Sequence, residues 1–320
     1  MPRYHKQVPA TRQTRAYVTL TLVAALWGSY PAFAKLALVH FSPYLLVALR
    51  CSVASIFLSV LLLRRGFGEI RGVGWADMRS FAFLGFVGIF VSTGGTYLGI
   101  AFTTAGSAAI LQAATPVMVA IGARFYLGER LRRAQWIGVA CSTVGVLLVV
   151  TKGQWRAVVQ ADLRPGDLIL LGAQIGWSAY TIYGKRVLAV HSPAVATTCA
   201  YVLGSLMLVP MAFLTARFFP APNYAAPVAW GVVAYQAFLG AIAHVWWYEG
   251  VRSVGPSRSA IFMNFQPVVG VLLAYVMLGE RVGLVEVLGG GAVLAGVGFV
   301  TRPGAAGGGS PPPTAPRHTG

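Results

Sequence analysis

Long apolar runs alternate with short polar segments from residue 17 to residue 301. Each run has roughly the 20 apolar residues that a helix needs to cross the hydrocarbon core of a bilayer. The pattern therefore predicts an all-α integral membrane protein. The same runs predict ten membrane-spanning helices, at residues 17–39, 44–63, 80–101, 105–127, 133–150, 167–184, 194–215, 226–248, 256–278 and 283–301.

The composition favours the same class of protein. Of the 320 residues, 57% are hydrophobic and only 10% are charged, against roughly a quarter charged in soluble domains. The formal net charge of +17 does not indicate nucleic-acid binding, because the basic residues sit in small groups between apolar runs. Cys51, Cys141 and Cys199 lie singly inside apolar runs, a pattern that predicts neither disulfides nor a metal site.

The tetrapeptide Leu-Gly-Glu-Arg occurs twice, at Leu127–Arg130 and at Leu278–Arg281, 151 positions apart. Aromatic, basic and proline residues align when the chain is shifted against itself by this distance. For the first span of each half, the shift is one residue shorter. The aligned pairs include Tyr97 with Tyr248, Pro116 with Pro267, Trp27 with Trp177, Tyr30 with Tyr180, and Lys35 with Lys185. Such matches indicate duplication of one unit.

Each predicted copy holds five spans, so the second copy enters the bilayer in the opposite orientation. The basic residues test this inversion, because Lys and Arg gather in cytoplasmic loops. Loops on the side of the N-terminus hold most of them, whereas the opposite loops hold only Lys152, Arg156, Arg164, Arg217 and Arg281. We therefore expect two inverted five-helix repeats, with both termini in the cytoplasm.

The predicted organisation has five parts. A cytoplasmic N-terminal tail at 1–16 precedes the first repeat at 17–151, and an external linker at 152–166 leads to the second repeat at 167–301. A cytoplasmic tail at 302–320 follows. This tail is rich in Gly and Pro and poor in apolar side chains, so we expect it to be disordered.

Three runs of the chain resemble the EamA-type repeats of the drug/metabolite transporter superfamily. They are ALWGSYPAFAKLAL at Ala25–Leu38, TPVMVAIGARFYLGERLRRAQWIGVACSTVGVLLV at Thr115–Val149 and QPVVGVLLAYVMLGERVGLVEVLGGGAVLAGVGFV at Gln266–Val300. The resemblance extends over both halves. It implies ten helices, a central cavity between the repeats, and usually export of small metabolites such as amino acids, amines or toxic organic compounds.

Helical spacing places Trp27, Tyr30 and Lys35 within an arc of about 140° on the first span, and their counterparts likewise on the sixth. Aromatic rings with a polar edge suit a pocket for an amphipathic or cationic solute. The alternative is an interfacial aromatic belt, with the lysines extending to the membrane surface. The predicted cavity residues are Trp27, Tyr30, Lys35, Tyr97, Gln112, Trp177, Tyr180, Tyr248, Asn264 and Gln266.

Four further positions are chemically distinctive. Pro116 and Pro267 predict bends in the fourth and ninth spans, because proline removes a backbone donor; such a bend either exposes polar backbone to a substrate or is purely structural. His244 and Glu249, on the eighth span, are candidates for proton coupling, because imidazole titrates near neutral pH. The alternative, which is the more common role of a histidine at a helix end, is a residue that is only hydrogen-bonded.

Arg50 lies well inside the second span and should find a carbonyl or acidic partner, because an unpaired charge at membrane depth is costly. Its counterpart in the second repeat is Ala200 or Tyr201, so any such pairing is specific to the first repeat.

The inverted repeat favours transport, since two half-sites near the midplane can open alternately to either side. The sequence predicts an inner-membrane carrier, not an enzyme, that exports small metabolites, uses no cofactor or metal, and is a monomer or homodimer. An intramembrane enzyme would need a nucleophile and base, or metal ligands, at a spacing that the sequence lacks. A non-transporting scaffold that binds a partner protein stays open as the alternative.

Overall fold

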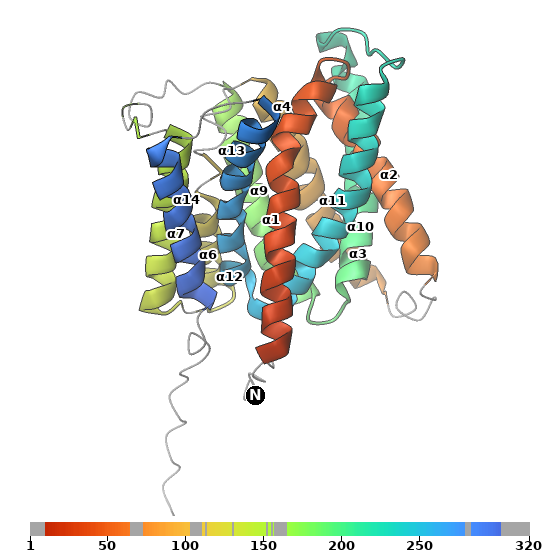
Figure 1. The fold of residues 1–320 in the computed structure, drawn as a ribbon. Coiled ribbons are helices and arrows are strands. Elements are labelled where there is room, and N and C mark those ends of the chain that lie inside the picture. The colour runs from red at the N-terminus through yellow and green to blue at the C-terminus, as the bar shows by residue number, and fades with distance from the viewer. Residues whose placement is uncertain are drawn as a thin grey trace, which may run out of the picture.

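A computed structural model of the chain describes residues 10–64, 73–102, 111–112, 114–129, 131–151, 153–154, 156, 165–278 and 283–301. These residues are almost wholly helical, contain no strand, and form a bundle of upright helices (Figure 1). The predicted all-α fold is confirmed. Residues 1–9 and 302–320, most of the linker at 152–166, and Gly279, Glu280 and Arg281 of the second Leu-Gly-Glu-Arg lie outside the described residues. Residues 10–16, predicted as part of the N-terminal tail, are helical.

Helical segments occupy the predicted spans of the first repeat. They are α1 (Ala10–Leu38), α2 (Pro43–Arg64), α3 (Trp75–Leu84), η2 (Gly85–Gly94), α4 (Gly95–Ala101), α6 (Thr115–Tyr126) and α7 (Arg133–Thr151). The third predicted span is thus one continuous helix whose middle, η2, has the wider turn of a π-helix. The hydrophobic pattern did not predict this widening, because η2 is short and lies inside one continuous apolar run.

The second repeat follows the same order. Its helices are α9 (Pro165–Val187), α10 (Pro193–Thr215), the short η3 (Ala216–Phe218), α11 (Pro227–Val254), α12 (Pro256–Ile261), η4 (Phe262–Asn264), α13 (Phe265–Leu278) and α14 (Leu284–Thr301). The beginning of α1 and the end of α14 lie at the same end of the bundle (Figure 1).

The second span of each repeat begins in the same way. The Ser42 hydroxyl accepts a hydrogen bond from the Leu45 amide at 3.4 Å, and the Ser192 hydroxyl accepts one from the Val195 amide at 3.3 Å. A proline follows each serine and occupies the first helical turn, where its missing N–H costs nothing. Equivalent residues therefore start equivalent helices.

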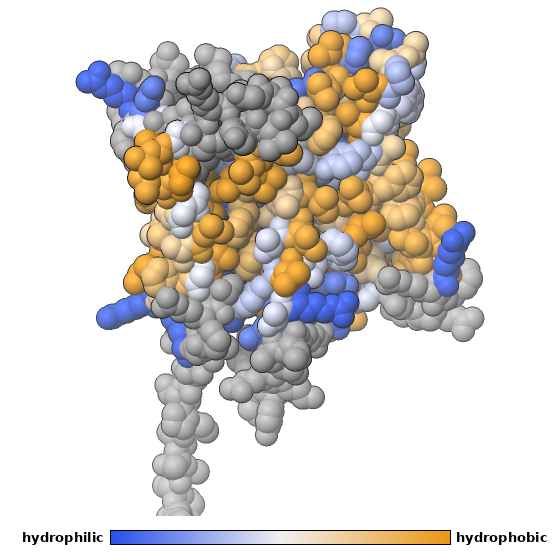
Figure 2. Space-filling view, in the orientation of Figure 1, coloured by the Kyte–Doolittle hydropathy of each residue, from blue (hydrophilic) through white to orange (hydrophobic). Residues whose placement is uncertain are grey.

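The outer surface of the bundle is that of a membrane protein. In the described chain, five helices are long and apolar enough to cross a bilayer, at Gln13–Leu38, Pro43–Arg64, Trp75–Ala101, Pro193–Phe218 and Pro227–Val254. Hydrophobic residues cover the middle of the face shown in Figure 2, and hydrophilic residues gather at its upper and lower margins. Large apolar side chains such as Ile56 and Phe213 are exposed on the outside of the bundle, as expected where lipid replaces water.

Helices α7 and α14 lie side by side at one flank of the bundle (Figure 1) and pack through glycine. A Cβ on Gly145 would lie 2.6 Å from the Gly289 carbonyl oxygen, and a Cβ on Gly296 would lie 2.6 Å from the Gly138 carbonyl oxygen. The two contacts are equivalent under the 151-residue offset, as a pseudo-two-fold axis requires. Gly138 of α7 faces Gly296 of α14, whereas Gly145, further along α7, faces the earlier residue Gly289. The two helices therefore run antiparallel.

The remaining helices interleave the two repeats. Helix α1 packs on α11 and α13, α2 packs on α10 and α11, and α9 packs on η2 and α4. The centre of the bundle is therefore built by both copies, and any site placed there takes residues from each.

Candidate functional site

A cavity of about 120 Å³ lies between the two repeats. Helices α1, α2, η2, α4, α9, α11, η4 and α13 contribute to its wall, in the half of the bundle towards the end of α1. The lining residues are Trp27, Tyr30, Ala34, Arg50, Ser92, Thr93, Thr96, Tyr97, Ile100, Gln112, Gln174, Trp177, His244, Met263 and Gln266. A largely apolar wall with a few polar groups is typical of sites for small molecules.

The aromatic part of the wall centres on Trp27 and Trp177. Their indole rings meet edge to face, with 5.1 Å between centroids and 86° between planes. The His244 ring lies 4.9 Å from Trp27 and 5.7 Å from Trp177. The Trp177 indole N–H donates to the Met263 sulfur at 3.1 Å. Equivalent residues of the two repeats thus form one aromatic surface in the interior of the bundle.

Hydrogen bonds hold the polar part of the wall in place. The Tyr97 hydroxyl donates to Gln236 Oε1 at 2.6 Å, and Gln236 Nε2 donates to the Tyr30 carbonyl at 3.3 Å. The Thr115 hydroxyl donates to Gln174 Oε1 at 2.7 Å. These bonds fix the rotamers of buried side chains.

The wide helix η2 brings hydroxyl groups to the cavity. The Thr93 hydroxyl donates to the Gly88 carbonyl, five residues earlier, at 2.9 Å. Ser92, Thr93 and, in α4, Thr96 all line the cavity. π-Helical turns are frequent at functional sites, and here the widened turn coincides with the polar wall.

Six of the predicted cavity residues line this cavity: Trp27, Tyr30, Tyr97, Gln112, Trp177 and Gln266. Tyr180 and Tyr248 instead lie buried behind it, stacked on each other with 4.6 Å between ring centroids. Asn264 is also buried away from the cavity, where its amide donates to the Ser142 hydroxyl at 2.7 Å. Lys35, near the end of α1, is exposed and does not line the cavity.

The two candidates for proton coupling are not together. His244 is buried in the cavity wall, and its Nδ1 lies 2.8 Å from the Gly240 carbonyl and 2.9 Å from the Tyr201 hydroxyl. Glu249 is exposed on a surface pocket that it shares with Arg15 and Arg252. Five helical positions separate the side chains by about 140° around α11, so they face different surroundings.

Both prolines lie where the helix is interrupted. Pro116 is the second residue of α6, which begins directly after the turn at Ala114. Pro267 is the third residue of α13, and the tight η4 turn immediately precedes that helix. Gln112 and Gln266, each close to a proline, reach the cavity wall.

Sequence reasoning missed part of the polar wall, notably Ser92, Thr93, Thr96 and Gln174. A usable signal was present, because Ser92, Thr96 and Ile100 recur at helical spacing within an apolar run. Arg50, for which the sequence predicted a carbonyl or acidic partner, also lines the cavity. Its guanidinium carbon lies 5.0 Å from the centre of the Tyr97 ring and 6.0 Å from that of Tyr30, and no acidic residue is among those described in the cavity wall.

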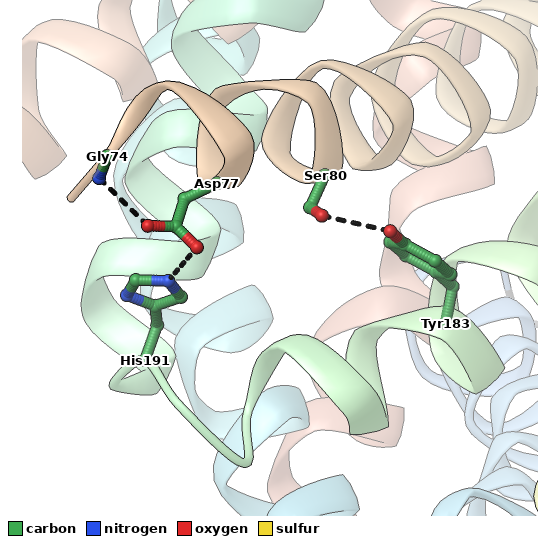
Figure 3. Close-up of polar contacts among 5 residues, drawn as sticks. All are labelled: Gly74, Asp77, Ser80, Tyr183 and His191. Atoms are coloured by element: carbon green, nitrogen blue, oxygen red, sulfur yellow. Dashed lines mark hydrogen bonds and ion pairs between the residues drawn. The ribbon is translucent and has the colours of Figure 1, made fainter.

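At the other end of the bundle, α3 of the first repeat contacts the turn between α9 and α10 (Figure 3). The Asp77 carboxylate lies 3.0 Å from His191 Nε2 and accepts a hydrogen bond from the Gly74 amide at 2.8 Å. Ser80 and Tyr183 hydrogen-bond through their hydroxyls at 2.9 Å. These polar contacts join the repeats at the end where α1 begins.

Comparison with known proteins agrees with this architecture. A sequence profile of the EamA-like transporter family matches residues 14–151 and residues 164–302. The Bacillus subtilis protein "Uncharacterized transporter YyaM" is 27% identical over 286 residues, which cover 88% of this chain and 92% of that protein. The Escherichia coli (strain K12) protein "Uncharacterized inner membrane transporter YedA" is 23% identical over 286 residues, covering 86% and 87%.

A solved crystal structure of another protein has the same fold. It superposes with a TM-score of 0.72 at 19% sequence identity, covering 90% of this chain and 96% of that one.

Proposed function

The chain belongs to the EamA-like transporter family, and from that premise we propose that it exports small amphipathic metabolites, such as amino acids or amines, by alternating access. The substrate binds in the central cavity against Trp27 and Trp177. One observation carries this proposal: the two indoles occupy equivalent positions in the two repeats and meet at one cavity that both repeats line.

A difference between the two half-sites supports alternating access. In the second repeat, Tyr180 and Tyr248 stack on each other and are fully buried. Their counterparts in the first repeat, Tyr30 and Tyr97, both border the cavity. One half-site is thus packed shut while its equivalent is open, and exchange of the two conformations moves the opening to the other side.

The predicted topology indicates to which side of the membrane the cavity opens in this conformation. The cavity lies towards the end of α1, which is the external end if the N-terminus is cytoplasmic. The Asp77–His191 contact lies at the opposite end, where it holds the cytoplasmic side closed. The described conformation is then the outward-facing one.

Flux through sealed proteoliposomes tests the proposal. Trp27→Ala and Trp177→Ala should each lower substrate flux by about tenfold, because each removes a stacking surface from the cavity. Trp136→Ala is the matched control, since Trp136 is a partly exposed tryptophan of α7 outside the cavity. Unchanged flux in both cavity variants would exclude substrate binding against Trp27 and Trp177. No movement of any compound would favour a scaffold, and chemical conversion of a bound compound would favour an enzyme.

The proposed location is the inner or plasma membrane, with both termini in the cytoplasm and with a monomer or homodimer as the functional unit. Labelling of single cysteines placed after Arg130 and after Arg281 tests the orientation. The first should react from the cytoplasm and the second from outside. Reaction of both from the same side would exclude the inverted topology.

A further inference from the structure

Arg50 is a buried cation whose donors are incompletely used. Its side chain is only 2% exposed, and its Nε and Nη1 atoms have no hydrogen-bond partner. The aromatic rings of Tyr30 and Tyr97 face the guanidinium and attract its charge. A ring face, however, does not satisfy a planar fork of N–H donors, and a buried charge without hydrogen bonds is unfavourable.

Other donors with no partner line the same cavity. The Trp27 indole N–H and the Tyr30 hydroxyl also lack hydrogen bonds. A Cβ placed on Gly240 would lie 2.6 Å from the Tyr30 hydroxyl oxygen and 3.7 Å from Arg50 Nη1, so these two polar groups meet where α11 has no side chain. The indole and guanidinium groups can only donate. The cavity therefore offers donors and positive charge, and it suits a ligand rich in acceptors.

On the basis of the proposed transport function, we propose that Arg50 binds the substrate directly and that the substrate carries a carboxylate. A carboxylate has two acceptor oxygens in one plane, and it accepts two parallel hydrogen bonds from neighbouring N–H groups of a guanidinium. Trp27 and Trp177 then cover the apolar part of the same molecule. The counterpart of Arg50 in the second repeat is Ala200 under the 150-residue offset, so the cavity contains one such group and accommodates one carboxylate.

The His244 ring supplies a complementary group. Its Nδ1 lies 2.8 Å from the Gly240 carbonyl, which can only accept, so Nδ1 carries the proton. In the neutral ring Nε2 is then an acceptor, and it has no partner. An amino acid with an apolar side chain satisfies both ends, with its carboxylate at Arg50 and its ammonium at His244. A purely cationic amine lacks the group that Arg50 requires.

Binding to the purified full-length protein tests this assignment through thermal stabilisation, which reports affinity. The probes are phenylalanine, 3-phenylpropionate, phenylalanine amide and phenyl phosphate. The first two carry a carboxylate and should bind, and the amide should bind at least about thirtyfold more weakly. Equal binding of the amide would overturn the proposal. Tighter binding of phenyl phosphate than of 3-phenylpropionate would overturn the choice of carboxylate.

The second part of the experiment uses the variant Arg50→Met. Arg217→Met is its control, because it removes an arginine outside the cavity. Arg50→Met should weaken binding of 3-phenylpropionate by about thirtyfold or more, and should leave the melting temperature of the ligand-free protein unchanged or higher, because it removes an unpaired buried charge. Unchanged carboxylate affinity would overturn the proposal. If Arg50→Met does not fold, Arg50 is structural, and the probe series on the unaltered protein decides the substrate class.

Transport and carboxylate recognition can fail separately. A protein that binds carboxylates through Arg50 but moves none of the probes refutes the carrier proposal alone. A protein that moves amines, and whose flux Arg50→Met leaves unchanged, refutes the carboxylate assignment alone.

Discussion

Ser55 and Ser205, which are equivalent residues of the two repeats, hydrogen-bond to each other with 3.0 Å between their hydroxyl oxygens. Two equivalent residues can touch only where the pseudo-two-fold axis passes between them. The Trp27–Trp177 contact meets the same condition. The axis that relates the repeats therefore passes from the α2–α10 contact to the cavity, and the candidate site lies on it.

The serine pair should couple energetically. The Ser55 hydroxyl already donates to the Cys51 carbonyl at 2.7 Å, so it accepts from Ser205. We expect Ser55→Ala and Ser205→Ala each to lower the free energy of unfolding by about 1 kcal/mol, and the double variant to lose less than the sum. Denaturation in detergent measures this coupling. Additive losses would mean that the two hydroxyls do not share a bond in the folded state.

Glycine packing between α7 and α14 should be sensitive to added volume. Gly145→Val places atoms against the backbone of α14 and should cost about 1–3 kcal/mol or separate the helices. Gly296→Val should have a similar effect, because its contact is the symmetric one. Gly291→Ala is the control on α14, since no atom lies within 4 Å of a Cβ there. A tolerated Gly145→Val would show that the two helices pack less closely.

Gly240 should matter for binding more than for folding. Its substitution by Ala places a methyl group 2.6 Å from the Tyr30 hydroxyl and close to Arg50, so substrate affinity should fall by about tenfold or more. Gly231→Ala on the same helix has open space and should be neutral, or more stable by about 0.5–1 kcal/mol, since alanine favours a helix. Binding titration of both variants, compared with melting temperature, distinguishes the two effects. If Gly240→Ala and Gly231→Ala bind the substrate with equal affinity, Gly240 is not part of the binding site.

The Asp77–His191 contact should hold the end of the bundle that is closed in this conformation. Asp77→Asn removes the charge that faces His191 and weakens the acceptor of the Gly74 amide. Hydrogen exchange should then accelerate by about twofold to fivefold in residues 73–80 and 188–192, because the contact is partly exposed and of modest strength. Ser80→Ala is the control that keeps the Asp77–His191 contact. Unchanged exchange at 188–192 would mean that packing of His191 on Phe81 holds the turn.

Much of the fold could be predicted, because the signals were long or repeated. Each apolar run needed only its length to be identified as a helix, and α2, α7, α10 and α14 lie within a few residues of the prediction. The Trp27–Trp177 relationship came from the offset alone. Helical spacing was a weaker guide: it placed Lys35 and Tyr180 on the same faces as the tryptophans, yet Lys35 is exposed and Tyr180 packs on Tyr248.

The sequence by itself determined that this chain is a duplicated helical membrane protein, because hydrophobic length and internal repetition are properties of the linear chain. Tertiary structure decided which residues share a surface. The cavity wall, in which the η2 hydroxyls and the Arg50 guanidinium with its unused donors meet the aromatic rings, arises only when helices from both repeats interleave. The physical reason is that a cavity is defined by atoms from several helices at once, and neither the spacing within one helix nor the offset between two copies specifies how deeply they pack.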